Sequence, residues 1–189
     1  MKAVLISIRP QWCELIAAGR KTIEVRKTRP KLDTPFKVYV YCTADAVKHI
    51  VFDEYGDRQI ELVPQMIIGE FVCDKIFDIC MEISDVNGFH GCPFPGTGLL
   101  DIEIVQYLGN GETGYGWHIS ELVIYDKPKR LSCFRNPCVE YEKDYPQCGD
   151  CDYYRSMGEY PAECNCDGQK PLRRPPQSWC YVEELPKGE

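Results

Sequence analysis

Short apolar runs separated by glycine and proline limit the fold of this chain more than any other feature of its sequence. Lys2–Ile8 and Phe36–Cys42 have the length of strands and are apolar enough to lie inside a sheet. Residues 22–27 alternate apolar Ile23 and Val25 with charged Glu24 and Arg26, the period of a half-buried strand. Further strands are expected in three later segments, Gln65–Asp78, Gly114–Tyr125 (a turn, then a strand) and Pro175–Glu183.

Helical signals are few. Pro10 suits the first turn of a helix that runs to about Ala18, and Gly19 is a natural stop. Residues 99–108 fit either a short helix or a strand, and residues 43–64 are ambiguous, with a hairpin expected near Gly56. Many short strands with few helices predict an α+β fold built on a small mixed β-barrel with flanking short helices.

The composition changes at Cys133. From there to about residue 174 the chain is poor in Leu, Ile and Val and rich in Cys, Tyr, Asp and Glu. Such a segment buries too little aliphatic surface to order itself and needs a staple. Because core-like residues resume at Pro175, we predict a single domain over residues 1–189, with residues 133–174 as an insertion before the last strand.

Cysteine spacing suggests that zinc is the staple. Cys148-Gly-Asp-Cys151 is a C-x2-C pair, whose turn places two thiolates on one metal at about 2.3 Å. Cys138 and Cys164 are the expected third and fourth ligands, and Cys166 or Cys133 could replace one of them. Four thiolates with no open position predict a structural zinc ion.

Two other interpretations of the cysteine cluster stay open. An iron–sulfur cluster also takes four thiolates. The cysteines could instead be free thiols or a redox pair, although this C-x2-C does not open a helix after a strand as thioredoxin-like motifs do.

Charge and hydropathy exclude some classes of protein. No apolar run approaches the roughly 18–20 residues that span a bilayer, and no secretory cleavage site follows the first apolar run, so we expect a cytoplasmic protein without a membrane partner. The net charge of −7 argues against nonspecific nucleic-acid binding over the whole surface. Residues 1–31, however, hold eight Lys and Arg against two acids, which suits one anionic ligand.

A basic–acidic motif lies in this N-terminal region. Gly19-Arg-Lys-Thr-Ile-Glu-Val-Arg26 combines a tight turn, an exposed Lys21 and a strand whose outward side chains are Glu24 and Arg26. A carboxylate between two cations offers donors and acceptors to a polar ligand. The same pattern also fits a surface ladder of salt bridges.

At this motif the sequence resembles the ASCH domains of the PUA-like superfamily. Ile8-Arg9-Pro10 followed by a helix and then GRKTIEVRK is similar to the opening of these domains. Further similar segments are IGEFVC from Ile68, GYGWHISEL from Gly114 and PPQSWCYVEEL from Pro175. The resemblance covers about residues 3–131 and 175–186, with the cysteine-rich segment inserted between them.

The resemblance implies a β-barrel with a cleft for RNA or a modified nucleoside, lined by Lys21, Glu24 and Arg26. Trp12, Trp117 and His118 would stack on a base or contact its edge in such a cleft. Core packing would explain both tryptophans equally well, and a partly buried histidine with a satisfied partner would explain His118.

The family also suggests an enzyme. Some similar small proteins hydrolyse the acetyl amide of an acetylated cytidine with a Lys, a Thr three residues later and a Glu from a later strand. Here Lys21 and Glu70 match, but Glu24 stands at the threonine position, which puts that mechanism in doubt, and Thr22 is the neighbouring hydroxyl. Other members look like ribonucleases, for which Glu24 with Lys21 or His118 could form an acid–base pair.

Three hypotheses follow. The first is a module that binds RNA or a modified nucleoside through Lys21, Glu24 and Arg26. The second is an amidohydrolase or ribonuclease whose catalytic residues would be Lys21, Glu24 and Glu70. The third is an interaction protein whose zinc segment docks a protein partner.

Overall fold

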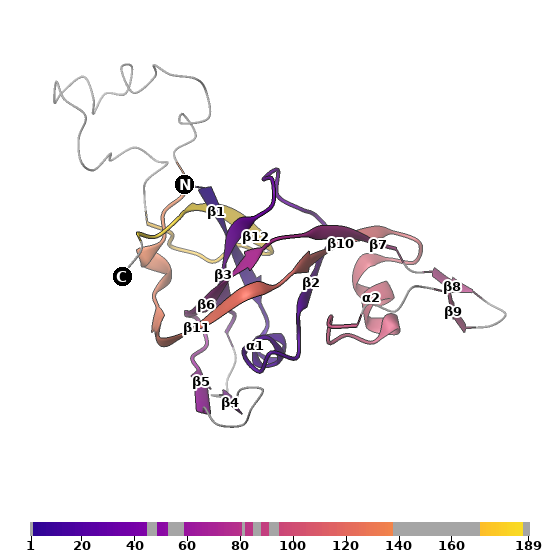
Figure 1. The fold of residues 1–189 in the computed structure, drawn as a ribbon, viewed down its shortest axis with the longest axis horizontal. Helices are drawn as coiled ribbons and strands as arrows, with labels where there is room; N and C mark the ends of the chain where they lie inside the picture. The colour runs from indigo at the N-terminus through magenta and orange to yellow at the C-terminus, as the bar shows by residue number, and fades with distance from the viewer. Residues whose placement is uncertain are drawn as a thin grey trace, which may run out of the picture.

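The computed structural model describes residues 2–44, 49–52, 59–80, 82–84, 88–90, 95–137 and 171–186 (Figure 1). These residues form mostly strands, with two α-helices and one 3-10 turn. The strands are β1 (Lys2–Ile8), β2 (Ile23–Arg26), β3 (Phe36–Cys42), β4 (His49–Phe52), β5 (Gln59–Leu62), β6 (Ile67–Cys73), β7 (Ile76–Cys80), β8 (Glu82–Ser84), β9 (Gly88–His90), β10 (Thr113–His118), β11 (Ser120–Lys129) and β12 (Trp179–Glu183). The helices are α1 (Pro10–Ala17) and α2 (Asp101–Leu108), and the 3-10 turn is Leu131–Cys133.

A five-stranded sheet forms the centre of the fold, in the order β11-β6-β3-β1-β12. β1 pairs in parallel with β3 and antiparallel with β12, so it has a neighbour on both sides. Its side chains are buried on both faces: Val4 and Ile6 belong to one core cluster, and Ala3 and Leu5 to another. Double-sided burial explains why this strand is an almost continuous apolar run.

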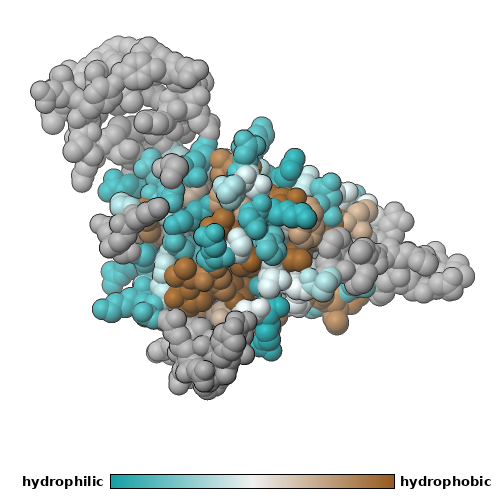
Figure 2. Space-filling view, viewed as in Figure 1, coloured by the Kyte–Doolittle hydropathy of each residue, from teal (hydrophilic) through white to brown (hydrophobic). Residues whose placement is uncertain are grey.

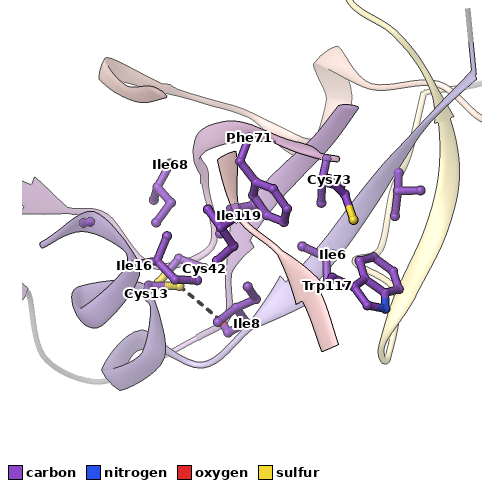
Figure 3. Packing of buried hydrophobic residues seen from close by; sticks show 14 of the residues in the cluster. Ile6, Ile8, Cys13, Ile16, Cys42, Ile68, Phe71, Cys73, Trp117 and Ile119 are labelled. Carbon is purple, nitrogen blue, oxygen red and sulfur yellow. Dashed lines mark hydrogen bonds between the residues drawn. The ribbon is translucent and has the colours of Figure 1, made fainter. Parts of the chain in front are cut away.

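A three-stranded sheet, β2-β10-β7, joins the first sheet through the main core. Trp117 of β10 is fully buried there, with its ring edge-on to Phe36 and Trp179 at centroid distances of 6.0 Å each. α1 adds Cys13 and Ile16 to the same cluster, as Figure 3 shows. This core therefore fixes α1 and both sheets relative to one another.

The predicted mixed α+β class is confirmed, but the predicted barrel is not closed. Within the described residues the two sheets have separate hydrogen-bond ladders, and β11 and β12 are the edges of the larger one. The chain crosses between the sheets at Ile119, directly before β11. β11 then pairs with β6 through two register shifts, and such irregularities bend a strand and interrupt its ladder.

Two glycines explain one error in the predicted strands. The segment from Gly114, expected to start as a turn, is part of β10. A Cβ on Gly114 would lie 2.4 Å from Leu108 of α2, and one on Gly116 would lie 2.5 Å from Phe77 of β7. These glycines therefore allow close packing of a strand against its neighbours and do not form a turn.

The expected strand Gln65–Asp78 is two strands, β6 and β7.

The helix signals were more accurate. α1 starts at Pro10, and Gly19 follows it with a φ of 69°, the left-handed conformation that glycine adopts easily. Residues 101–108, for which helix and strand were both open, form α2. No helix in the described part of the chain is long and apolar enough to cross a membrane.

The second face of the five-stranded sheet is covered by the segments on either side of residues 138–170. Phe134 packs edge-on against Tyr39 with a centroid distance of 4.7 Å. Leu172 donates a backbone hydrogen bond to Phe134 at 2.8 Å, and Arg135 forms a bridge with Pro171. The two ends of the intervening segment are thus tied together beside β12.

Burial on both faces of β1 predicts a large effect of truncation there. Ile6→Ala should lower the free energy of unfolding by about 2–5 kcal/mol, because it leaves a cavity in the main core. Val123→Ala should lower the free energy of unfolding by only about 0.5 kcal/mol, because Val123 is 50% exposed on β11. Hydrophobic side chains also gather on part of the molecular surface (Figure 2). Urea unfolding measures both variants, and equal losses would contradict the assignment of β1 to the core.

Candidate functional site

A cleft of about 990 Å³ opens between the start of α1, β2, α2 and the segment that leads into β12. This volume lies at the upper end of the range for pockets that hold small organic ligands. The side chains that line it include three predicted site residues of the basic–acidic motif, Lys21, Glu24 and Arg26, and also Trp12. Further lining residues are Ser7, Arg9, Tyr41, Glu103, Tyr107 and Ser178.

The Lys21–Glu24–Arg26 network lies at the base of the cleft and is buried. The sequence predicted that Lys21 is exposed and that Glu24 and Arg26 face outward. This prediction is wrong, because the three residues are only 2%, 6% and 7% exposed. Strand β2 is covered on both faces. α2 packs against the Val25 side, and residues of β1 and of the segment before β12 contact the Arg26 side.

Lys21 uses all three of its donor positions. Its Nζ donates to the carbonyl oxygens of Ile23 at 2.8 Å and Thr97 at 2.5 Å, and it lies 3.3 Å from Oε2 of Glu24. Burial lowers the pKa of Lys21, the Glu24 carboxylate opposes that shift, and the Arg26 charge adds to it. The ammonium is therefore fixed in direction and held by one carboxylate.

Glycines bring Thr97 to Lys21. Gly96 and Gly98 have φ values of 91° and 67°, and the carbonyl of Gly96 accepts hydrogen bonds from the backbone of Thr22 and Ile23. The loop thereby docks on the start of β2. The glycines on either side of Thr97 are visible in the sequence, but no motif around them indicates this contact with β2.

Arg26 connects three segments that are far apart in the sequence. Its Nη2 donates to the carbonyl of Ser7 at 2.7 Å and lies 2.9 Å from Oε1 of Glu24, while Nη1 donates to Oγ of Ser178 at 3.3 Å. Its Nε has no hydrogen-bond partner among the described residues. Two cations thus share one carboxylate, which leaves the base of the cleft with a net positive charge.

Trp12 stands over this network at the start of α1. Nζ of Lys21 lies 5.8 Å from the centroid of its ring, within the range of a cation–π contact. Trp12 is only partly buried, so it can still offer ring surface to the cleft.

Two predicted site residues, Trp117 and His118, lie outside the cleft. Trp117 pairs with Glu24 across β10 and β2 but is fully buried in the core, with no surface open to a ligand. His118 is partly exposed, and its Nδ1 lies 2.7 Å from Oδ1 of Asp74. Neither residue lines the cleft.

Glu70 belongs to a separate polar cluster on the five-stranded sheet. Its carboxylate accepts hydrogen bonds from Lys37 at 2.8 Å and from Tyr125 at 2.5 Å. Burial alone would raise the pKa of Glu70, but these two hydrogen bonds outweigh it and hold the pKa below its usual value. Glu70 does not line the cleft that contains Lys21.

The predicted zinc ligands Cys138, Cys148, Cys151 and Cys164 lie outside the described residues, as does Cys166. Cys133 is described, and it is an exposed free thiol. Among the described residues there is no group of three or more His, Cys, Asp or Glu side chains placed to hold a metal ion.

Comparisons with known proteins agree with this fold. A model of the ASCH domain family matches residues 6–93. The crystal structure of ASCH from Zymomonas mobilis is similar with a TM-score of 0.52 and 14% identity, covering 96% of this chain and 88% of that chain. A variant of that protein with serine replaced by alanine gives a TM-score of 0.51, at 14% identity and 96% and 89% coverage.

A second variant of the Zymomonas protein, with tyrosine replaced by phenylalanine, gives a TM-score of 0.52 at 15% identity and covers 97% of this chain and 92% of that chain. No curated protein matches the sequence. The family model thus supports the predicted ASCH domain over residues 6–93, and the solved structures have a similar fold.

The ion network predicts how Lys21 responds to loss of its carboxylate. Glu24→Gln should lower the pKa of Lys21 further, because the charge that opposes the effect of burial is removed. Between the lowered pKa of Lys21 in the folded variant and its usual pKa in the unfolded chain, the unfolded state binds more protons than the folded state. The free energy of unfolding of Glu24→Gln should therefore rise with pH over this range. NMR titration of labelled lysine measures the shift.

Glu103→Gln is the matched control for this titration. Glu103 lines the same cleft, but its carboxylate accepts a hydrogen bond from the backbone of Leu100 and not from Lys21. Glu103→Gln should therefore leave the pKa of Lys21 unchanged. Equal shifts in both variants would show that Glu24 has no special influence on Lys21.

Proposed function

We propose that this chain binds RNA or a modified nucleoside in the cleft, with the base against the open surface of Trp12 and its edge toward the Lys21–Glu24–Arg26 network. One observation carries the proposal: a buried, fixed set of donors and acceptors forms the base of an open cleft that has an aromatic side chain beside it. Such a combination of stacking surface and oriented polar groups is how proteins recognise an unpaired base.

The chemistry of Glu24 suits the edge of a base. A carboxylate has about four acceptor positions, and in this cluster it contacts Lys21 through one oxygen and Arg26 through the other. Acceptor capacity therefore remains for an amino or imino group of a base. The surplus positive charge of the network favours carbonyl oxygens or a phosphate on the same ligand.

Family membership and charge distribution support the same ligand class. The resemblance to PUA-like domains implies RNA or a modified base, and the ASCH family model covers the residues of the motif. The basic N-terminal region of an otherwise acidic chain supports a local anionic ligand and not a long nucleic-acid track.

A hydrolase acting on a modified nucleoside or on RNA is the second candidate. The observation that favours it is the 3.3 Å contact between Nζ of Lys21 and Oε2 of Glu24 in the cleft, an amine and a carboxylate within reach of proton transfer. Burial also lowers the pKa of that amine. Amide hydrolysis by Lys21 with Glu70 receives no support from the geometry, since Glu70 is bound to Lys37 and Tyr125 outside the cleft. Thr22 does not line the cleft either.

Zinc in the cysteine-rich segment remains a proposal. We infer that Cys138, Cys148, Cys151 and Cys164 hold a structural zinc ion, with Cys166 as the main substitute. The ties between Phe134 and Leu172 and between Arg135 and Pro171 support it, because a small metal-stapled unit needs its two ends close together. A protein partner would be a further role for this segment.

The function is tested with small RNA and a panel of modified nucleosides, scoring retained and converted species by LC–MS. Trp12→Ala should weaken retention by about 1–3 kcal/mol, the usual contribution of one stacked base, and His118→Ala should leave it unchanged because His118 lies outside the cleft. Conversion that is lost in Lys21→Met would instead establish the hydrolase. If the protein retained no species and converted none, both candidates would be contradicted and a protein partner would be favoured.

The zinc proposal predicts a metal content that depends on the cluster. Purified protein should contain about one zinc ion per chain by elemental analysis, and Cys148→Ser should lose it. Cys80→Ser is the control, because Cys80 is an exposed free thiol on β7. Iron in place of zinc would identify an iron–sulfur cluster, and a metal-free protein would leave the cysteines as thiols.

A further inference from the structure

We propose that the ligand is a single-stranded RNA segment of several nucleotides, because a basic–aromatic ledge extends the binding surface beyond the cleft. The ledge consists of Lys27, Arg29, Tyr107 and Tyr115. This inference rests on the proposed function, and it decides between a free nucleoside and a strand as the species bound.

Each cation of the ledge lies over an aromatic ring. Nζ of Lys27 lies 5.5 Å from the ring centroid of Tyr107, and Cζ of Arg29 lies 5.6 Å from that of Tyr115. Both cations are exposed, and Tyr107 is 39% exposed on α2. Phosphates and bases alternate along a nucleic-acid strand, so a cation beside a ring in each pair matches its chemistry.

The ledge is continuous with the cleft. Lys27 directly follows Arg26, the last residue of β2, and Tyr107 itself lines the cleft. Tyr115 is the cross-strand partner of Arg26 on β10. A strand that places one base over the network at Arg26 can therefore reach the ledge with the next nucleotides.

Hydrogen bonds hold the segment that carries the two cations. Trp179 donates from Nε1 to Oγ1 of Thr28 at 3.0 Å, and the backbone of Lys31 donates to the hydroxyl of Tyr181 at 2.7 Å. Both partners belong to β12, which is anchored on β1. Binding therefore needs little ordering of this segment, which favours affinity.

A second pair of cations lies on another side of the cleft. Arg173 and Arg174 are exposed and directly precede Pro175, the first of four consecutive residues that line the cleft before β12. Cations next to two different walls of the cleft fit a strand that enters on one side and leaves on the other. A free nucleoside would contact neither pair.

The test compares a labelled single-stranded RNA of about eight nucleotides with a mononucleotide competitor, using fluorescence anisotropy at several salt concentrations. The ledge variant carries Lys27→Gln and Arg29→Gln, since glutamine keeps an apolar stem but loses the charge. It should weaken binding of the strand about tenfold near 0.15 M salt and reduce the slope of log affinity against log salt by about 1.4, as expected for two lost phosphate contacts. Its affinity for the mononucleotide should not change.

The matched control carries Lys127→Gln and Arg130→Gln, which removes the same two charges from exposed positions on and after β11, at the opposite edge of the five-stranded sheet from β12. It should bind the strand like the unmodified protein. Equal weakening by both variants, or equal affinity for strand and mononucleotide, would overturn the ledge and leave the cleft intact.

Two further probes complete the test. An RNA duplex of the same length or a poly-glutamate peptide that bound as tightly as the single strand would also overturn the ledge, because neither offers bases to the tyrosines. Failure of both strand and mononucleotide to bind would overturn the proposed function itself, and the ledge with it.

Discussion

The guanidinium of Arg26 is the interaction on which the candidate site depends. It joins β2 to β1 through the carbonyl of Ser7 and to the segment before β12 through Ser178, while Glu24 balances its charge. A buried cation is costly unless it is paired and hydrogen-bonded. The position of β2 at the base of the cleft therefore depends on the pairing of the first and last strands of the described fold.

Local patterns predicted the parts of the fold that local forces determine. The limits of β1 and β3 match the apolar runs Lys2–Ile8 and Phe36–Cys42, and Pro10 and Gly19 delimit α1 as their backbone preferences require. The motif residues Lys21, Glu24 and Arg26 also meet as expected, since they lie within six positions of one another along one extended segment.

Burial and long-range partners were beyond the reach of such patterns. Alternation along β2 suggested a polar, outward face, but elements from distant parts of the sequence cover both sides of the strand. Three partners of Lys21 and Arg26 are backbone carbonyls, which every residue carries and no motif reveals. Glu70 fitted the order of a catalytic motif, yet its strand carries it to a different polar cluster.

The late position of β12 in the chain has a consequence for protein synthesis. β12 pairs with β1 across almost the whole sequence, Lys2 opposite Glu183, and the four residues before it form one wall of the cleft. Pairing over such a separation cannot begin until the residues of β12 have left the ribosome. A nascent chain therefore carries its basic motif without a finished cleft around it until β12 has been made, and ligand recognition becomes available only from that point.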